Sequence, residues 1–301
     1  MTTQAPPDSD LLTRFLLERA GVRGVRVHLR DAWREIAGRE AYPPVVAELL
    51  GQASAAAALF TGHAKVDGRL SVQLRGDGSL RTLFAECTAA GTLRGIVQLA
   101  GDGSDVTRDL RALGAGAVLA ITIENPGHGG RDPVRYQGLV GLDAATLPGA
   151  FEDYFRQSEQ LPTRILLAAD ESAAAGLMLQ KLPGDVGDDD GWTRASALFD
   201  TLGADELLAL SPDELLHRLF HEDEPRVVGT RGLRFGCSCS RERVAAMLES
   251  LGPDEARAAV IDGAARVRCE FCGQSYAFDP GDVDALFTRR TRPMAPPERL
   301  Q

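Results

Sequence analysis

Apolar and polar residues alternate along much of the first half of the chain, which is the pattern of strands that bury one face. The clearest run is 70–74, where two leucines and a valine alternate with serine and glutamine. Turn residues join this run to 80–87, and that run to 93–99, so the three predict an antiparallel meander. Further strands are expected at 24–30, 118–123, 134–142, 165–169 and 176–182.

Other apolar runs in this part have the spacing or composition of helices. The Ala-rich run 45–60 begins after two prolines, which suit a first helical turn, and 147–159 also predicts a helix. A short helix is expected over 11–18. We therefore interpret 11–184 as a strand-rich α/β domain, preceded by a disordered tail over 1–10.

Residues 185–230 differ because their apolar residues recur at helical spacing in a strongly acidic sequence. The positions concerned are Trp192, Ala195, Phe199 and Leu202, followed by Leu208, Leu215, Leu216, Leu219 and Phe220. Ser211 and Pro212 are expected to begin the later helix as its cap and first residue. The 12 acidic and 2 basic residues of 185–224 leave a net charge of −10, so these helices need a partner surface for their apolar stripe. The segment is then either a solvated helical linker or one whose folding is conditional.

The last part of the chain predicts a small unit over 231–282, followed by a tail over 283–301. Helices are expected over 240–251 and 253–261, and a β-like knuckle over 266–278. A unit of this size buries too little apolar surface to be stable alone, so a metal is expected as a staple. The predicted fold class is thus α+β, with a strand-rich α/β N-terminal domain, an acidic helical linker and a small C-terminal zinc-binding domain.

Four of the five cysteines lie in this small unit as two close pairs, Cys237 with Cys239 and Cys269 with Cys272, and 29 residues separate the pairs. Four thiols suit one tetrahedral metal ion, and zinc is the usual occupant of an all-sulfur site. We therefore expect one zinc ion per chain in the reduced form. Zinc ribbons usually have about two to four residues between paired ligands, whereas a single serine separates the first pair here.

The same centre can be a structural staple or an oxidant sensor. Arg234, Arg241, Arg243 and Arg268 are close to the thiols in sequence, and positive charge favours the thiolate that reacts with peroxide. Zinc contributes about 10–16 kcal/mol to small domains of this kind, and short-loop disulfides restore far less. Oxidation is therefore expected to unfold the unit, while a purely structural zinc remains the alternative.

Several function classes are not expected. No glycine directly precedes a lysine, so the sequence lacks a phosphate-binding Walker loop and ATP use through that motif is excluded. The segment 231–278 has a net charge of only +1, without the basic face of nucleic-acid binders. The five histidines form no triad signature with a cysteine or an aspartate, so an enzyme is not expected.

The chain is expected to be cytoplasmic and to have no membrane partner. Its start has neither the basic nor the apolar region of a signal peptide, and the longest uncharged run, 49–64, is too short to cross a bilayer. The fifth cysteine, Cys87, leaves an odd count, which argues against a secreted disulfide framework. Because Cys87 lies in an apolar, strand-like run over 80–88, it is expected in the core.

Several motifs, the cysteines included, carry a resemblance to a known family. They are Phe235–Arg243 with its C-x-C pair, Cys269–Gly273, Tyr154–Thr163, Gln73–Gly78 and Leu219–Glu222. With these motifs the chain resembles the redox-regulated heat-shock protein 33 family, the 33 kDa chaperonins, over nearly all of residues 10–280. The C-x-C pair is the most discriminating motif, and all four ligand positions agree with the family pattern.

The resemblance implies an ATP-independent holdase that is inactive while reduced and zinc-bound. Peroxide or hypochlorite, often with heat, would join Cys237 to Cys239 and Cys269 to Cys272 and release zinc. The linker would then unfold, and the exposed apolar surface would bind unfolding client proteins and prevent their aggregation. The active form in the family is typically a dimer. In this chain the candidate client-binding and linker surface comprises Trp192, Phe199, Leu215, Leu216 and Phe220.

Two other functions are weighed against this one. A structural zinc-ribbon module would bind nucleic acid or a partner protein, but the near-neutral charge of 231–278 weighs against it. A thiol–disulfide oxidoreductase would use Cys269 and Cys272. Such enzymes place this motif at the start of a helix in a thioredoxin-like domain, whereas here the pair follows two expected helices in a knuckle.

Overall fold

The computed structural model describes residues 10–127 and 132–288. The chain divides into two compact units, an N-terminal unit that ends at Gly236 and a C-terminal unit that begins at Cys237. The tail expected over 1–10 therefore lies outside the described residues, except for Asp10. Asp10 is buried, and its carboxylate accepts the backbone N–H groups of Arg30 and Ala32 at the start of helix α1 (Asp31–Ala37), a helix that the sequence pattern did not predict.

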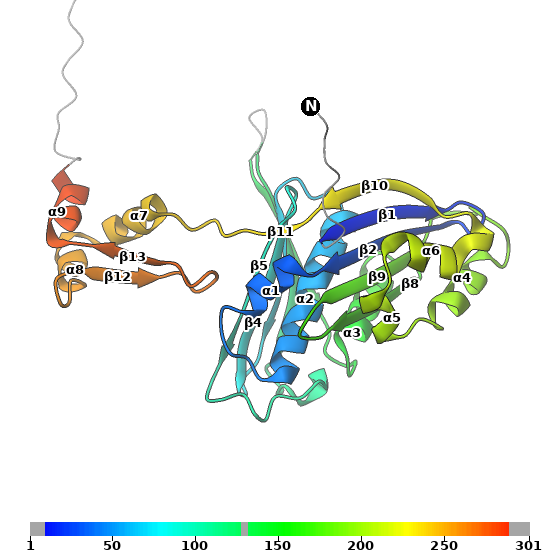
Figure 1. The fold of residues 1–301 in the computed structure, drawn as a ribbon, viewed down its shortest axis with the longest axis horizontal. Coiled ribbons are helices and arrows are strands. Elements are labelled where there is room, and N and C mark those ends of the chain that lie inside the picture. Colours follow the sequence, from blue (N-terminus) through cyan, green and yellow to red (C-terminus); the bar gives the residue numbers. More distant parts are fainter. Residues whose placement is uncertain (1–9, 128–131, 289–301) are drawn as a thin grey trace, which may run out of the picture. The chain divides into compact units, whose positions relative to one another are not determined.

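Two sheets build the N-terminal unit (Figure 1). The five-stranded sheet has the order β10 (Arg226–Gly232), β1 (Leu11–Leu17), β2 (Val22–Leu29), β9 (Ala174–Lys181) and β8 (Thr163–Ala169). The six-stranded sheet has the order β11 (Arg234–Phe235), β5 (Thr92–Leu99), β4 (Leu80–Thr88), β3 (Arg69–Arg75), β6 (Val118–Asn125) and β7 (Val134–Val140). Neighbouring strands are antiparallel except β11, which runs parallel to β5, and the predicted meander of β3, β4 and β5 is confirmed.

Helix α2 (Pro44–His63) lies between the two sheets, and its apolar side chains form the main core with both of them (Figure 1). Small residues allow the close approach: a Cβ atom at Gly51 would lie 2.4 Å from that of Ala169. By length and composition α2 is the one described helix that could cross a membrane, yet 72% of its apolar window is buried inside the protein. Burial of this extent is what a core helix shows.

Two further elements complete this core. Helix α3 (Leu147–Ser158), which the sequence predicted, packs Phe151 and Phe155 edge-on against Phe60 of α2, with ring centroids 4.9 and 5.2 Å away. A short 3₁₀ helix, η1 (Leu110–Ala112), buries Leu110 on the same core.

Three helices cover the other face of the five-stranded sheet (Figure 1). They are α4 (Gly191–Phe199), α5 (Ala204–Ala209) and α6 (Pro212–Phe220), and a 3₁₀ turn, η2 (His221–Asp223), follows them. Ser211 caps α6 as predicted, because its hydroxyl accepts the backbone N–H of Glu214 at 3.3 Å while the Glu214 carboxylate accepts the Ser211 N–H at 3.0 Å. Strands β1, β2, β8 and β9 of this sheet are therefore covered on both faces.

The short helix predicted over 11–18 is wrong, because this segment forms strand β1. Leu12 packs on the α2 side of the sheet, whereas Phe15 and Leu17 pack on the side of α4 to α6. A strand buried on both faces loses the alternation that marks a half-exposed strand. The helical expectation also fails over 226–230, which belongs to β10 and pairs with β1.

The C-terminal unit has its own small core around a two-stranded hairpin. Its elements are α7 (Arg241–Leu251), α8 (Pro253–Ala258), β12 (Ala265–Arg268), β13 (Ser275–Phe278) and α9 (Pro280–Thr288). The tail expected from 283 is wrong up to Thr288, because α9 continues there and Val283 is fully buried, whereas 289–301 lies outside the described residues. Residues 231–236, which the sequence assigned to this unit, belong to the N-terminal unit because β10 and β11 pair with its sheets.

Candidate functional site

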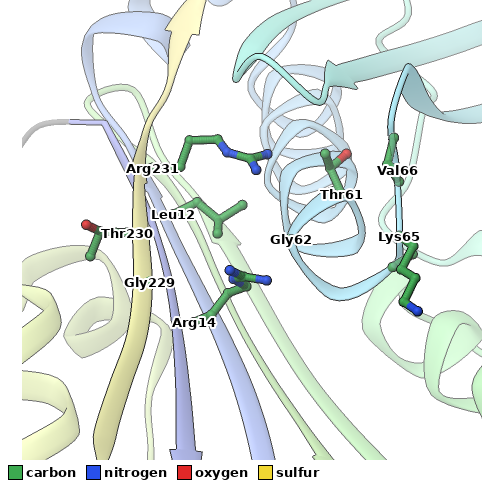
Figure 2. Close-up of a pocket in the computed structure, with 10 residues that line it drawn as sticks. Leu12, Arg14, Thr61, Gly62, Lys65, Val66, Gly229, Thr230 and Arg231 are labelled. Atoms are coloured by element: carbon green, nitrogen blue, oxygen red, sulfur yellow. The ribbon is translucent and has the colours of Figure 1, made fainter. Parts of the chain in front are cut away.

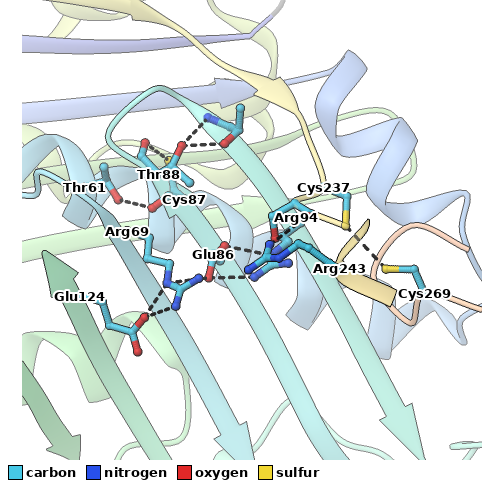
Figure 3. A network of polar contacts seen from close by, with 12 residues as sticks. Thr61, Arg69, Glu86, Cys87, Thr88, Arg94, Glu124, Cys237, Arg243 and Cys269 are labelled. Atoms are coloured by element: carbon cyan, nitrogen blue, oxygen red, sulfur yellow. Dashed lines mark hydrogen bonds and ion pairs between the residues drawn. The ribbon is translucent and has the colours of Figure 1, made fainter. Parts of the chain in front are cut away.

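The C-terminal unit brings its four cysteines together. All four sulfur atoms lie within 4.8 Å of one another. Cys237 Sγ is 3.7 Å from Cys269 Sγ (Figure 3), and Cys239 Sγ is 3.2 Å from Cys272 Sγ. A zinc ion with Zn–S bonds of about 2.3 Å would hold its tetrahedral sulfurs about 3.8 Å apart. The four thiols therefore have the donor type, number and spacing of a closed metal site.

A tight turn between β12 and β13 presents the second cysteine pair. The backbone N–H of Cys269 donates to the carbonyl of Gln274 at 2.8 Å, and the N–H of Gly273 donates to the carbonyl of Cys269 at 2.9 Å. Gly273 has a φ of 68°, a left-handed conformation that favours glycine. This turn directs the Cys269 and Cys272 side chains toward the other cysteine pair.

The first cysteine pair lies in the loop that leads into α7. Ser240 caps this helix by accepting the N–H of Arg243 at 3.2 Å, and the Arg243 guanidinium donates back to the Ser238 carbonyl at 2.7 Å. Arg241 donates to the Ala277 carbonyl at 2.7 Å. The sequence suggested that these two arginines would favour the thiolate form of the cysteines. In the structure, their hydrogen bonds hold the backbone around the cysteines in place. Arg234 belongs to the N-terminal unit.

One contact to sulfur was not visible in the sequence. The Tyr276 hydroxyl, on β13, donates to Cys239 Sγ at 3.2 Å. Burial alone would raise the pKa of Cys239, but the hydrogen bonds from Tyr276 and from the neighbouring thiols lower that pKa to about 7. Burial raises the pKa of Cys272 to about 12 and also raises that of Cys237. Cys237, Cys239 and Cys272 therefore differ in acidity, and among these three Cys239 has the lowered pKa.

A second set of candidate residues lies between the linker helices and the five-stranded sheet. Phe199, Leu215, Leu216 and Phe220 are buried there, and Trp192 is partly buried beside them. They pack on apolar side chains of β1, β2, β8 and β9, among them Phe15, Val22, Ala168, Leu177 and Leu179. The partner surface that the apolar stripe required is thus this face of the sheet.

Two polar side chains of β2 also hold the linker, and the sequence pattern gave no sign of either. Arg26 is 1% exposed and donates to the Leu210 carbonyl, while His28 Nε2 lies 2.9 Å from the Leu208 carbonyl. Burial lowers the pKa of Arg26 to about 10, against the opposing effect of Asp213 and Glu214. Both bonds reach carbonyls at the end of α5, where a helix leaves such groups without partners.

Arginines offset part of the acidic charge of the linker. Arg194 pairs with Asp223 and with Asp188, at 2.6 and 3.1 Å, and with Asp190 at 2.8 Å. Asp223 is almost fully buried. Arg164 of β8 pairs with Asp200 in the same way from the sheet side. Arg194 thus gathers three of these carboxylates around one cation, and Arg164 neutralises a fourth.

The fifth cysteine belongs to the core, as predicted. Cys87 is 1% exposed, and burial raises its pKa to about 12. The Thr61 hydroxyl donates to its carbonyl at 3.4 Å (Figure 3). Neighbouring Glu86 points to the opposite face of the sheet, where it pairs with Arg94 at 2.8 Å. A buried thiol with a raised pKa is a poor nucleophile.

Comparisons with known proteins agree with this geometry. The family model described as Hsp33 protein matches residues 10–279. The 33 kDa chaperonin of Ectopseudomonas mendocina is 42% identical over 286 residues, covering 93% of this chain and 95% of its own length. That of Chromobacterium violaceum is 39% identical over 280 residues, covering 92% and 94%. The crystal structure of a 33 kDa chaperonin from Thermotoga maritima has the same fold, with a TM-score of 0.75, 22% identity and coverage of 93% of this chain and 98% of its own.

Proposed function

This chain belongs to the Hsp33 family of chaperones, and on that premise we propose that it is a redox-regulated, ATP-independent holdase. The observation that carries the proposal is the meeting of four thiols within 4.8 Å. Cys237, Cys239, Cys269 and Cys272 would hold one zinc ion in the reduced, inactive form. Bound zinc supplies cross-linking of the loop before α7 to the β12–β13 turn, which the small core of this unit needs for stability.

Oxidation is proposed to join Cys237 to Cys239 and Cys269 to Cys272. For each disulfide, two thiolates give two electrons to a peroxide, whose O–O bond breaks and which leaves as two waters after taking up two protons. The shortest sulfur contacts run between the pairs, from Cys237 to Cys269 and from Cys239 to Cys272. In a tetrahedral cluster all four sulfurs are near neighbours, so these contacts do not select the pairing, and short-range loop closure favours the two cysteines within each close pair.

Loss of the metal is proposed to release the linker. Only a short stretch of chain separates the last buried linker residue, Phe220, from the first ligand, Cys237. Once the C-terminal unit unfolds, the two strands in this stretch, β10 and β11, lose their fixed end. The acidic helices α4 to α6 would then leave the sheet, because their carboxylates favour the solvated state.

Release would expose both sides of one apolar interface. The linker contributes Trp192, Phe199, Leu215, Leu216 and Phe220, and the sheet contributes the side chains that these residues cover. Unfolding client proteins are the proposed partners of these surfaces, and the oxidised form is proposed to be a homodimer. The proposal places the protein in the cytoplasm, gives it no catalytic residue, and involves no nucleic acid and no membrane.

The test combines zinc content with suppression of citrate synthase aggregation, before and after peroxide at elevated temperature. We expect one zinc per chain in the reduced protein, loss of zinc on oxidation, and suppression only afterwards. The Cys87→Ala variant is the matched control and should behave like the parent, because Cys87 lies in the core of the N-terminal unit. Zinc retained in both states without suppression would leave a structural zinc-ribbon module instead.

A further inference from the structure

A cationic cavity lies where β1 and β10 face the end of helix α2 (Figure 2). Its volume is about 230 Å³. Arg14, Lys65 and Arg231 line it together with small and neutral residues, and no described carboxylate does. The lining is thus cationic, although the chain has a formal net charge of −10.

The strand register explains why two of these cations share the cavity. Arg231 lies opposite Leu12, and Gly229 lies opposite Arg14. Residues directly opposite in an antiparallel pair project to the same face, so both guanidiniums leave the sheet on the side of α2, as Figure 2 shows. A Cβ atom at position 229 would lie 3.1 Å from Arg14 Nη2, so the glycine leaves space for that guanidinium.

The three cationic side chains of this cavity are exposed, and no carboxylate of residues 10–127 and 132–288 lies within ion-pair distance of them. Within these residues, the side chains of Arg14, Lys65 and Arg231 form neither an ion pair with a carboxylate nor a hydrogen bond. Other arginines of the same unit, such as Arg164 and Arg194, are paired with aspartates. Like charges that are diagonal neighbours on one face of a sheet repel each other.

The end of α2 accounts for part of this arrangement. A helix C-terminus carries a partial negative charge of about half a unit, which attracts cations. Three full positive charges exceed it severalfold. The Thr61 hydroxyl on this wall is neutral and donates to the Ala57 carbonyl at 2.7 Å, so it supplies no counter-charge. A net positive cavity remains.

We propose that this cavity binds a small soluble phosphate, either inorganic phosphate or a compact oligophosphate. The planar guanidinium fork matches the oxygens of a phosphoryl group, and two forks can share one tetrahedral anion. The volume is below the about 300–1,000 Å³ of sites for drug-sized ligands, which suits a small anion. The bound anion would join β10 to β1 and to the end of α2. Because β10 directly follows the linker, binding stabilises the N-terminal unit, independently of the redox chemistry of the C-terminal unit.

The experiment is calorimetric titration of the reduced full-length chain with inorganic phosphate and with pyrophosphate, at an ionic strength held constant with sodium chloride. Saturable binding is expected, and Arg14→Ala or Arg231→Ala should each weaken it about tenfold or more, the effect of losing a charged hydrogen bond. Arg75→Ala, which removes one positive charge from β3 outside the cavity, is the matched control and should bind like the parent.

A second variant keeps both arginines in place. Gly229→Asp sets a carboxylate beside Arg14, and the resulting internal ion pair should abolish phosphate binding while the thermal unfolding transition is kept. This variant still tests phosphate binding if an arginine variant fails to fold. A titration heat that does not saturate would overturn the proposal, as would a heat that sodium chloride alone reproduces. Binding that is unchanged in all cavity variants, or an equal loss of binding in Arg75→Ala, would also overturn it.

Discussion

The ring of Phe220, at the end of the linker, stacks on the ring of Phe15, in the first strand of the chain, with centroids 6.1 Å apart and an interplanar angle of 28°. Both side chains are almost fully buried. The contact joins residues that are about 200 positions apart in sequence and closes the apolar interface between α6 and the sheet. The apolar stripe of the linker is thus part of a core and not a solvated face.

Truncation of Phe220 should release the linker without oxidation. Phe220→Ala removes the stacked ring, and truncation of a buried phenylalanine typically costs about 3–5 kcal/mol. Each 1.4 kcal/mol is about a tenfold change in an equilibrium constant, so the population of the docked linker relative to the released linker should fall steeply. We expect aggregation suppression and rapid proteolysis within 185–224 while zinc is still bound. Tyr136→Ala, at a ring that is 52% exposed on β7, is the control. An inert, protease-resistant Phe220→Ala protein with full zinc content would contradict the proposed docking.

Removal of two zinc ligands from the C-terminal unit should also activate the protein without oxidation. Cys269→Ser with Cys272→Ser leaves two thiols, too few to hold zinc in a closed site. We expect loss of zinc, loss of folded structure in the C-terminal unit, and aggregation suppression that no longer depends on peroxide. Zinc content, near-ultraviolet circular dichroism and the aggregation assay measure these effects. Full zinc affinity together with normal switching in this variant would rule out the proposed switch.

The local pattern of the sequence predicted most elements of the N-terminal unit, but α1, β1 and β10 are among those it missed. In β1, Leu12 meets α2 while Phe15 meets the linker, so apolar residues on both faces gave a helix-like spacing. Strand β10 is largely exposed, and its pairing with β1 joins residues more than 200 positions apart. Such pairing depends on tertiary contacts that no short window of sequence contains.

The same distinction applies to the candidate site. The four cysteines could be predicted because ligand type and spacing are local properties of the sequence. Tyr276 could not, because its hydroxyl reaches Cys239 only after the β12–β13 hairpin folds. Arg26 looked like an ordinary polar residue of an alternating strand, and only the covering linker makes it a buried group. The roles of Tyr276 and Arg26 depend on tertiary contacts, so the local sequence around them does not predict these roles.

Loss of the Tyr276 hydroxyl should weaken metal binding. The hydroxyl lies 3.2 Å from Cys239 Sγ and stabilises negative charge on that sulfur, which is the form that binds zinc. Partners of this kind typically account for about 10–100-fold in metal affinity. We expect Tyr276→Phe to lose zinc to a competing chelator at a correspondingly lower concentration, and to be activated by less peroxide. Unchanged competition would mean that the hydroxyl has no part in holding the metal.

A cluster around Glu159, at the end of α3, should give the N-terminal unit a pH-dependent stability. The Glu159 carboxylate lies 3.6 Å from His63 Nε2 on α2 and accepts a hydrogen bond of 2.9 Å from Gln180 on β9. Its interaction with His63, followed by that with Gln180, holds the pKa of Glu159 below the ordinary value of 4.5.

The sign of the effect follows from this direction. A carboxyl group whose pKa is lower in the folded state contributes stability above its unfolded pKa and loses that contribution as the pH falls through the folded pKa. The Glu159→Gln variant should therefore be less stable than the parent near neutral pH, and the difference should shrink below about pH 4.5. Urea unfolding of both proteins across this range measures it. Glu171→Gln, at an exposed turn between β8 and β9, removes the same charge and allows the net-charge effect to be subtracted. A parent–variant difference that stays constant down to pH 3 would show that the Glu159 contacts stabilise the fold without charge.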